Sequence, residues 1–519
     1  MKNGFFTRQC CNAKPYFLIL CCVLLSTCVQ NPVTGKKDFL LVTEQWEKQV
    51  GAQQYLPIRQ SQGGDYTVDP VVTEYVRAVG QRLAAHSDRD LPYEFNVIND
   101  SSANAWALPG GKISINRGLL VRLESEAELA AVLGHEIVHA AAKHGAKGQT
   151  RSIGLQLGVL TASLAGQREG YGQQAQILSS IGAQIVNSQY GQSAELEADR
   201  FGMEYMARAG YDPQGAVELQ RTFVELSKGQ PSDTLSRLFA SHPPSAKRVS
   251  ENIATAKELR QDGRVAADTY REKMATLFET AKAYELYDAA QRAFAKKDTQ
   301  QATRLVREAV RIEPREAHFH SLIGDISMSQ NSLANAKRSY DKAISLNSQF
   351  YYYYLRRGKI NELQRNSAAA KADYARSVKL LPTTSAQLSL GQFAEREGKP
   401  QVAKRYYAMA AQSTGDDADR AQQALLRLDP PQNVNTRLLV RQGMTRQGTF
   451  AIELINQTSA AIGNIRLGVS VASGPTQPLR AKTQTLAPGK RVVIDTGRVI
   501  TAPQVGRIKV VVLNADVFK

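Results

Sequence analysis

The chain has 519 residues and a formal net charge of +17 at pH 7, with 65 Lys and Arg against 48 Asp and Glu. All five cysteines fall within the first 28 residues, which excludes a disulfide-stabilised scaffold for the rest of the chain. Its stability must therefore come from packed apolar cores, which a chain of this length can supply.

The N-terminus has the pattern of an export signal. Basic residues precede the apolar run Tyr16–Leu25, which is too short to span a bilayer and fits the core of a signal peptide. The following Leu-Ser-Thr-Cys28 resembles a bacterial lipoprotein cleavage box. We therefore expect residues 1–28 to be a lipoprotein-type signal peptide, with diacylglyceryl on Cys28 as a membrane anchor. The chain would then lie in the bacterial periplasm, held at the outer membrane.

The segment Glu124–His144 carries the strongest chemical motif. It is rich in Ala, lacks Pro and has apolar residues at helical spacing, so it predicts a helix. His135 and His139 are four residues apart and share one helix face, so both imidazoles can reach one metal ion. Glu136 is then held over the open coordination position, where it can take a proton from zinc-bound water. The alternative is a helix with two satisfied histidines. His144 points off this face and is expected beside a ligand or at the surface.

A zinc site of this kind needs a third protein ligand. The extended HExxHxxGxxH pattern is excluded, because Ala142 and Gly145 stand where its glycine and last histidine would be. The helical run at residues 193–205 offers Glu195 and Asp199, which are four apart on one face. We expect Glu195 to bind the metal and Asp199 to accept a hydrogen bond from a ligand imidazole. The alternative is a solvated acidic helix face.

From about residue 283 the sequence repeats with a period of 34 residues. Small residues recur in register, namely Ala302, Ala336, Ala370, Gly324 and Gly358. Small residues where helices cross predict tetratricopeptide helix pairs over residues 283–428, after a helical linker at 263–282. Such arrays form a concave surface that binds peptides or partner proteins.

Composition changes after Asp429-Pro-Pro431. Short β-rich runs are separated by Asn, Gly and Pro turn residues, and they predict an all-β sandwich of roughly immunoglobulin-like size at residues 432–519. We recognise no catalytic constellation in this module.

The basic excess lies on these accessory modules. Residues 283–382 carry 17 Lys and Arg against 10 Asp and Glu, and residues 432–519 carry 12 against 3. In a cytosolic chain this would suggest nucleic acid. In an exported chain it points to acidic partner proteins or anionic lipid head groups, or to a solvated surface. We expect no nucleic-acid partner.

The HExxH motif followed by Glu195 and Asp199 resembles the zinc peptidase family of the CaaX prenyl proteases and heat-shock membrane proteases. Further segments match that family's pattern: residues 31–35, Asn104–Ile113, and Ser241–Pro244 with Arg248. The match covers about residues 31–260, so we expect the peptidase domain at residues 29–262. With its repeats, the chain resembles periplasmic tetratricopeptide-containing β-barrel assembly-enhancing proteases, from which it departs in its C-terminal module.

This resemblance implies a multidomain protein. The expected parts are an α+β, mostly helical zincin-type peptidase domain, an α-helical tetratricopeptide array and the C-terminal all-β sandwich. One Zn²⁺ per chain would be bound by His135, His139 and Glu195, with Glu136 as the catalytic base.

The resemblance also implies roles for three further sites. An edge strand would pair with extended substrate, and its residues are Asn104, Gly110, Gly111 and Ile113. Arg248 would stabilise the developing oxyanion, or form a surface salt bridge. His242 would occupy the fourth zinc position and shut off the resting enzyme, or cap the next helix or pack on Pro243.

These expectations combine into a zinc metalloendopeptidase that cleaves unfolded or misassembled envelope proteins. Its repeats would bind substrates or partner proteins, and its lipid anchor would bind the membrane. Two other functions remain open. One is a chaperone-like adaptor in outer-membrane protein assembly, with proteolysis minor or latent; the other is a peptidoglycan-cleaving metalloenzyme.

Overall fold

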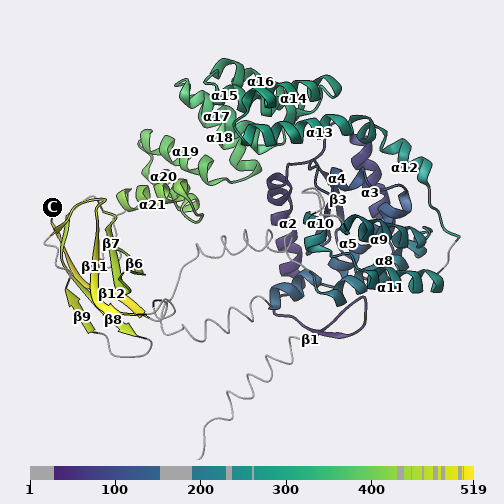
Figure 1. Cartoon of the computed structure of the whole chain (residues 1–519), viewed down its shortest axis with the longest axis horizontal. Coiled ribbons are helices and arrows are strands. Elements are labelled where there is room, and N and C mark those ends of the chain that lie inside the picture. The colour runs from purple at the N-terminus through teal and green to yellow at the C-terminus, as the bar shows by residue number, and fades with distance from the viewer. Residues whose placement is uncertain are drawn as a thin grey trace, which may run out of the picture. The chain divides into compact units, whose positions relative to one another are not determined.

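The computed structural model describes residues 28–151, 190–228, 236–259, 262–428 and, of the C-terminal region, 438–445, 447–458, 461–471, 477–480, 485–500, 505 and 508–518 (Figure 1). Residues 1–27 of the predicted signal peptide lie outside these described residues. The chain divides into two compact units, one containing residues 1–364 and 379–381, the other residues 365–378 and 382–519. No helix in the described part is long and apolar enough to cross a membrane.

The first unit opens with a short antiparallel hairpin made of β1 (Cys28–Gln30) and β2 (Lys37–Phe39). Two helices follow, α2 (Glu44–Ser61) and α3 (Pro70–Ala84). The side chain of Asp69 caps α3 by accepting a hydrogen bond from a backbone N–H of its first turn. Proline at the first helical position suits this start, because its missing N–H would have no partner in the helix.

A three-stranded sheet lies beside these helices. Its strands are β3 (Glu94–Ile98), β4 (Ala105–Leu108) and β5 (Lys112–Asn116), in the order β3-β5-β4. β5 runs parallel to β3 and antiparallel to β4. Gly110 and Gly111 form the turn between β4 and β5 with φ of +79° and +80°, a conformation that favours glycine.

The central helix of the unit is α5 (Glu126–Ala141), and every residue in it is buried. The side chain of Ser125 caps its N-terminus. α8 (Gln192–Arg208) packs closely against α5 because glycines meet where the helices cross. A Cβ at Gly134 would lie 3.0 Å from the carbonyl oxygen of Gly202, so even a methyl group at this crossing would require the two backbones to shift apart.

Shorter helices complete this part of the unit. α4 (Arg117–Leu120) follows β5, and α9 (Gln214–Ser227) packs on α5. α10 (Ser236–Ser241) is followed by α11 (Ala246–Glu258), which packs on α8 and α9, and α12 (Ala267–Lys273) leads to the repeats.

One continuous apolar core joins the peptidase region to the first repeats. It includes Tyr270, Met274 and Leu277, none of which is more than 1% exposed, and it continues to Phe319 and Ile326 in the repeats. The predicted linker at residues 263–282 is therefore packed into the core. The predicted start of the repeats at residue 283 falls inside a single helix, α13 (Ala275–Ala295).

Polar contacts reinforce this junction. The carboxylate of Glu316 accepts hydrogen bonds from Asn99 Nδ2 at 2.9 Å and from the Tyr284 hydroxyl at 2.7 Å. The guanidinium of Arg117 lies 3.4 Å from the centroid of the Tyr284 ring, within cation–π range. All four residues are buried, so the first repeats and the peptidase region form one packed body.

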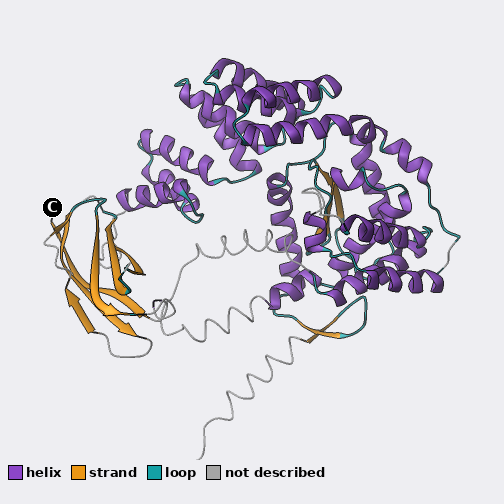
Figure 2. Cartoon of the chain, viewed as in Figure 1, coloured by secondary structure: helices purple, strands orange, loops and turns teal. Residues whose placement is uncertain are grey.

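The repeat region is helical throughout (Figure 2). After α13 its helices are α14 (Thr299–Ile312), α15 (Ala317–Ser329), α16 (Leu333–Leu346), α17 (Tyr351–Leu363), α18 (Ser367–Leu380), α19 (Thr384–Arg396), α20 (Pro400–Ala410) and α21 (Asp416–Leu428). Glycines allow close helix packing at two places, because a Cβ at Gly324 would lie 2.8 Å from the Tyr340 ring and one at Gly391 would lie 2.5 Å from the Tyr407 ring. This confirms the predicted helical array.

The C-terminal region contains two antiparallel sheets. One consists of β6 (Leu438–Met444), β7 (Thr449–Asn456) and β11 (Arg491–Val499), and the other of β8 (Ala461–Val471), β9 (Gln477–Arg480), β10 (Thr485–Leu486) and β12 (Ile508–Phe518). Ile452 and Leu454 of the first sheet share an apolar core with Ile462 and Leu467 of the second. The predicted all-β module is thus confirmed.

Candidate metal centre

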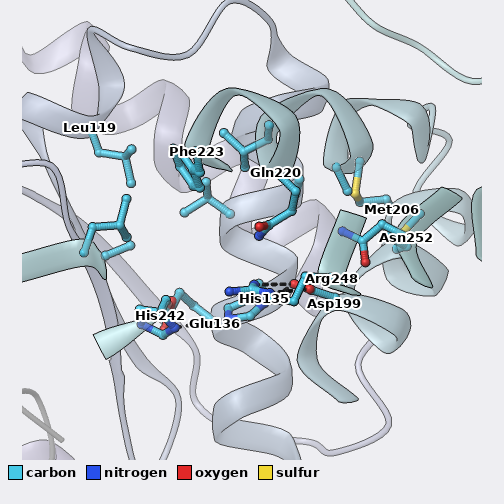
Figure 3. Close-up of a pocket in the computed structure, with 17 residues that line it drawn as sticks. Leu119, His135, Glu136, Asp199, Met206, Gln220, Phe223, His242, Arg248 and Asn252 are labelled. Carbon is cyan, nitrogen blue, oxygen red and sulfur yellow. Dashed lines mark hydrogen bonds and ion pairs between the residues drawn. The ribbon is translucent and has the colours of Figure 1, made fainter. Parts of the chain in front are cut away.

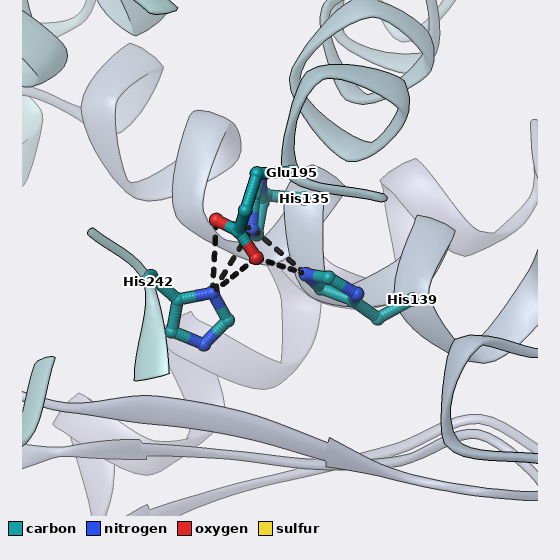
Figure 4. A group of neighbouring side chains, drawn as sticks. All are labelled: His135, His139, Glu195 and His242. Carbon is teal, nitrogen blue, oxygen red and sulfur yellow. Dashed lines mark hydrogen bonds and ion pairs between the residues drawn. The ribbon is translucent and has the colours of Figure 1, made fainter. Parts of the chain in front are cut away.

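Four side chains converge at one buried point beside α5 (Figure 4). His135, His139, Glu195 and His242 each offer one ligand atom, and these four atoms lie within 4.8 Å of one another. α5 supplies the first two histidines, α8 supplies the glutamate, and His242 directly follows α10. The Nε2 atoms of His135 and His139 are 2.9 Å apart, and Nδ1 of His242 lies 3.3 Å from Nε2 of His135.

The spacing of these atoms fits a tetrahedral zinc ion. Zinc bonds of about 2.0–2.2 Å to nitrogen and oxygen place neighbouring ligand atoms roughly 3.3–3.6 Å apart. Oε1 of Glu195 lies 3.2 Å from Nδ1 of His242 and 3.4 Å from Nε2 of His139. The residues present therefore fit the metal, and three or four of them can bind it at once.

The electrostatics of the cluster also favour a cation. Burial lowers the pKa of His139 well below its ordinary value, so its imidazole is neutral and can offer a lone pair. Burial opposes charge on Glu195, but His242 and His135 hold the pKa of this carboxyl well below its usual range. Burial also opposes charge on His135, yet Glu195 raises the pKa of this imidazole to about 10. The centre therefore attracts positive charge, which a divalent metal ion supplies.

Asp199 and Arg248 support the cluster from behind. Oδ1 of Asp199 lies 2.9 Å from Nδ1 of His135, on the side of the ring away from the ligand atoms. Arg248 donates to both oxygens of Asp199 at 2.7 Å, and its Nη1 lies 2.9 Å from Oε2 of Glu195. Because the Arg248 side chain is only 4% exposed, this ion pair is buried, and the alternative of a surface salt bridge is wrong.

Glu136 faces the same space. Its Oε1 lies 3.6 Å from Nε2 of His242, and its buried Oε2 has no hydrogen-bond partner among the described residues. Burial raises the pKa of this carboxyl. Next to it lies a pocket whose lining includes Leu119, Phe223 and Ala105, the last from β4 (Figure 3). A free acceptor oxygen beside a metal cluster and a pocket is placed to activate a water molecule.

The predicted edge strand needs a correction. We expected one strand through Asn104, Gly110, Gly111 and Ile113, but the structure folds this segment into a hairpin. β4 lies at the edge of the described sheet, the glycines form the turn, and Ile113 lies in the central strand β5 with no exposed surface. The cause is the glycine pair, since two successive residues with positive φ reverse the chain.

Two aromatic neighbours of His139 complete the site. Nδ1 of His144 lies 2.8 Å from Nδ1 of His139, so His144 stands beside a ligand, one of the two places expected for it. The Tyr190 ring stacks on His139 with centroids 3.9 Å apart and an interplanar angle of 21°. Sequence reasoning missed Tyr190, whose only signal is its position five residues before Glu195.

Comparison with known proteins places the chain in a family. Residues 70–255 match peptidase family M48, and residues 317–350 match a tetratricopeptide repeat. The chain is 32% identical over 246 residues to the mitochondrial metalloendopeptidase OMA1 of Schizosaccharomyces pombe, an alignment that covers 46% of this chain and 70% of that protein. It is 30% identical over 185 residues to the metalloprotease LoiP of Escherichia coli, covering 35% and 71%. The chain therefore belongs to peptidase family M48, which confirms the predicted zinc metallopeptidase class.

A third relative also carries the family's peptidase. The chain is 29% identical over 214 residues to the β-barrel assembly-enhancing protease of E. coli, an alignment that covers 39% of this chain and 43% of that protein. The chain thus matches less than half the length of this relative. Together with the repeat match, the similarity confirms the expected resemblance to proteases of this kind.

Proposed function

We propose that the chain is a zinc-dependent endopeptidase that cleaves unfolded or misassembled proteins of the bacterial envelope. One observation carries the activity: three metal-binding side chains, His135, His139 and Glu195, converge beside the unpartnered carboxylate oxygen of Glu136. This set suits one Zn²⁺ per chain.

Each residue of the site has its own role in peptide hydrolysis. Zinc, when bound, supplies a Lewis acid that polarises the scissile carbonyl and lowers the pKa of water to about 7. Glu136 accepts the proton of the attacking water through its free oxygen and then delivers it to the leaving amine. Asp199 orients the His135 ring, and Arg248 neutralises Asp199 and Glu195 from behind. Nη1 of Arg248 lies 2.9 Å from Oε2 of Glu195, and Arg248 would stabilise the negative charge that develops on the substrate carbonyl oxygen.

Substrate binds along β4 in this proposal. β4 is at the edge of the described sheet, and its first residue, Ala105, lines the same pocket as His135 and Glu136. An extended polypeptide added to this edge would run past the catalytic base and be recognised largely through its backbone. Asn104 directly precedes the strand.

His242 acts as a latch in the resting enzyme. Its Nδ1 lies at the metal-facing side of the cluster, within 3.3 Å of both His135 Nε2 and the Glu195 carboxylate. This is the place that the attacking water must take. An exported protease surrounded by folding clients benefits from such a latch, because it prevents indiscriminate cleavage.

Other parts of the chain support a cellular location and a kind of partner. The N-terminal pattern and the similarity to the E. coli β-barrel assembly-enhancing protease support a periplasmic location, with Cys28 as the lipid anchor at the outer membrane. The tetratricopeptide array supports binding of protein substrates or partners.

The latched cluster also favours a second candidate function. With four side chains within 4.8 Å of one another, the protein resembles a latent enzyme, which suits a chaperone-like adaptor in outer-membrane protein assembly. The two candidates differ in whether bound clients are cleaved.

A trapping experiment tests the proposal. We expect Glu136→Gln, crosslinked in cells, to hold envelope proteins that the wild-type chain degrades, because the amide keeps the shape of the side chain but cannot act as a base. The variant should retain one zinc and lose roughly 10²–10⁴-fold in proteolytic rate. His135→Ala serves as the control that loses the metal. If Glu136→Gln and wild-type proteins hold the same clients and neither degrades them, the adaptor function stands and the protease function fails.

A further inference from the structure

The side of His139 that faces away from the cluster is joined to the N-terminus of the described chain by a line of polar contacts. Nδ1 of His139 lies 2.8 Å from Nδ1 of His144, and Nε2 of His144 lies 3.3 Å from Oε1 of Glu197. Asn31 Nδ2 donates to the same Glu197 oxygen at 3.1 Å. His139, His144 and Asn31 are all at most 4% exposed, whereas the Glu197 side chain is 21% exposed. The contact between the two histidines is therefore shielded from water, and Glu197 lies at the border with solvent.

The direction of each hydrogen bond follows from the chemistry of its partners. Asn31 Oδ1 accepts from the backbone N–H groups of Val33 and Thr34, which fixes the side-chain amide with its NH₂ toward Glu197. A carboxylate only accepts, so the N–H of neutral His144 lies on Nε2 and points at Glu197. Nδ1 of His144 is then an acceptor, and Nδ1 of His139 must donate to it. The lone pair of His139 is thereby left on Nε2, which faces the other ligand atoms.

The hairpin that carries Asn31 is itself fixed to the helical segment that carries His144. Lys147 Nζ lies 2.7 Å from Oδ2 of Asp38, and Thr150 Oγ1 accepts from the backbone N–H of Leu41 at 3.0 Å. Asn31 closes the turn of the hairpin, because its N–H donates to the carbonyl of Lys36 at 2.7 Å. The position of Asn31 against Glu197 is therefore set by the hairpin as a whole.

We propose that the N-terminal hairpin, residues 28–39, positions the metal ligand His139 through Asn31, Glu197 and His144. This chain of contacts gives His139 what Asp199 gives His135, namely an acceptor for the outer ring nitrogen. It fixes the tautomer and the ring orientation, and it makes the first residues after Cys28 part of the metal centre. The inference rests on the proposed zinc enzyme, because His139 must bind the metal for its orientation to matter.

The decisive variant is Asn31→Asp in the full chain. Aspartate keeps the size of the side chain and the acceptor for the turn, but it sets a second carboxylate oxygen against Glu197. We expect its zinc dissociation constant, measured by competition with a chelator, to rise about 10–100-fold. The absorption spectrum of the Co²⁺-loaded protein should shift, and kcat should fall more than KM rises. Lys37→Gln is the matched control, since it changes an exposed side chain of the same hairpin outside this line of contacts and should leave zinc affinity unchanged.

A paired substitution separates positioning from general stability. When Asn31→Asp is combined with Glu197→Gln, the new amide can donate to the introduced carboxylate and still accept from His144. Zinc affinity should then return to within a few-fold of wild type. His144→Phe keeps a ring but no nitrogen, so it should weaken zinc binding as Asn31→Asp does.

Two results would overturn the inference. The first is a zinc affinity of Asn31→Asp and His144→Phe within twofold of wild type. The second is an equal affinity loss in Lys37→Gln, together with a lower melting temperature of both metal-free variants, which would indicate that any change in the hairpin acts through general stability. If the wild-type chain itself binds no zinc, the proposed function fails as well, and that failure is visible before any variant is compared.

Discussion

His242 stands between the metal-binding side chains and Glu136, the proposed catalytic base. Its Nδ1 lies 3.2 Å from Oε1 of Glu195, and its Nε2 lies 3.6 Å from Oε1 of Glu136. We expect His242→Ala to raise the basal cleavage of an unfolded test protein, because the substitution frees the place where Glu136 must activate water. An open state populated at about 0.1–10% in the wild type implies a rise of about 10- to 1,000-fold. Zinc content should stay at one per chain, because three protein ligands remain.

The cleavage rate and the zinc content of His242→Ala together decide the role of His242. A lower rate would make His242 a catalytic or substrate-binding group. An unchanged rate with unchanged zinc would reduce it to a packing residue beside Pro243.

Glu128, in the first turn of α5, makes the free energy of unfolding depend on pH. Burial raises the pKa of this carboxyl from 4.5 to about 7. Folding therefore favours its protonated form, so the stabilisation is complete below about pH 4.5 and is lost as the pH rises through 7. We expect Glu128→Gln to raise the free energy of unfolding at pH 8 by about 1–3 kcal/mol, because the amide has no charge to desolvate.

The same comparison at low pH is the control. At about pH 4 the metal-free variant and the metal-free wild type should unfold at nearly the same urea concentration, since Glu128 is then mostly protonated in both the folded and the unfolded chain. Glutamine also keeps an acceptor for the backbone N–H of Glu124, which now lies 2.7 Å from the carboxylate. An equal gain in the free energy of unfolding at both pH values would contradict the raised pKa of Glu128.

At the scale of helices, the α5–α8 crossing sets the metal centre. Gly134 and Gly202 let the backbones approach until a Cβ on Gly202 would lie 3.0 Å from the backbone nitrogen of His135. We expect Gly202→Val to separate the helices, to cost about 1–3 kcal/mol of stability and to weaken zinc binding, because Glu195 moves away from the histidines. Urea unfolding and zinc titration measure the two effects. Gly148→Ala is the control, since nothing lies within 4 Å of its added Cβ.

The sequence predicts the site residues that lie on the same helix, because their spacing along the chain decides whether they share a face. The interval of four residues places His135 and His139 on one face, and the same interval pairs Glu195 with Asp199. The 34-residue period likewise predicts the repeat helices, and Gly324, one of the residues that keep this period, lies against Tyr340 of the next helix.

Contacts between distant segments were not predictable from spacing. Tyr190 stacks on His139, and Arg248 reaches Asp199, only because the tertiary fold brings three helices together. The hairpin of β4 and β5 was missed because the glycine pair was taken as part of a strand, whereas its positive φ angles make it a turn. The latch and the roles of the site residues stay predictions that the variants above test.

For the molecule as a whole, the first repeats complete the peptidase. Tyr270 is fully buried and its hydroxyl donates to the carbonyl of Leu120 at 2.6 Å. A chain ended at residue 262 would lose Tyr270, Met274 and Leu277, each worth about 1.5–3 kcal/mol of buried surface. We expect it to fold poorly and to bind no zinc, since a domain's net stability is only about 5–15 kcal/mol.

The comparison for the chain truncated at residue 262 is a chain truncated at residue 364, where the main segment of the first compact unit ends. It should unfold in one cooperative transition, bind one zinc and cleave an unfolded test protein. Circular dichroism during urea unfolding and metal analysis distinguish the two chains. A stable, zinc-loaded chain ending at residue 262 would show that the peptidase folds without the repeats.

The shared core also has a consequence for the order of synthesis. The catalytic helix is made early, yet the apolar surface that it helps to form is closed only by side chains as late as Phe319 and Ile326. At a synthesis rate of roughly 5–20 residues per second, the segment from residue 262 to Ile326 takes on the order of 3–13 seconds to make. During that interval the nascent protein holds every zinc ligand but not the packing that holds them together. The apolar core behind the metal centre is therefore completed only after the first repeat helices have been made.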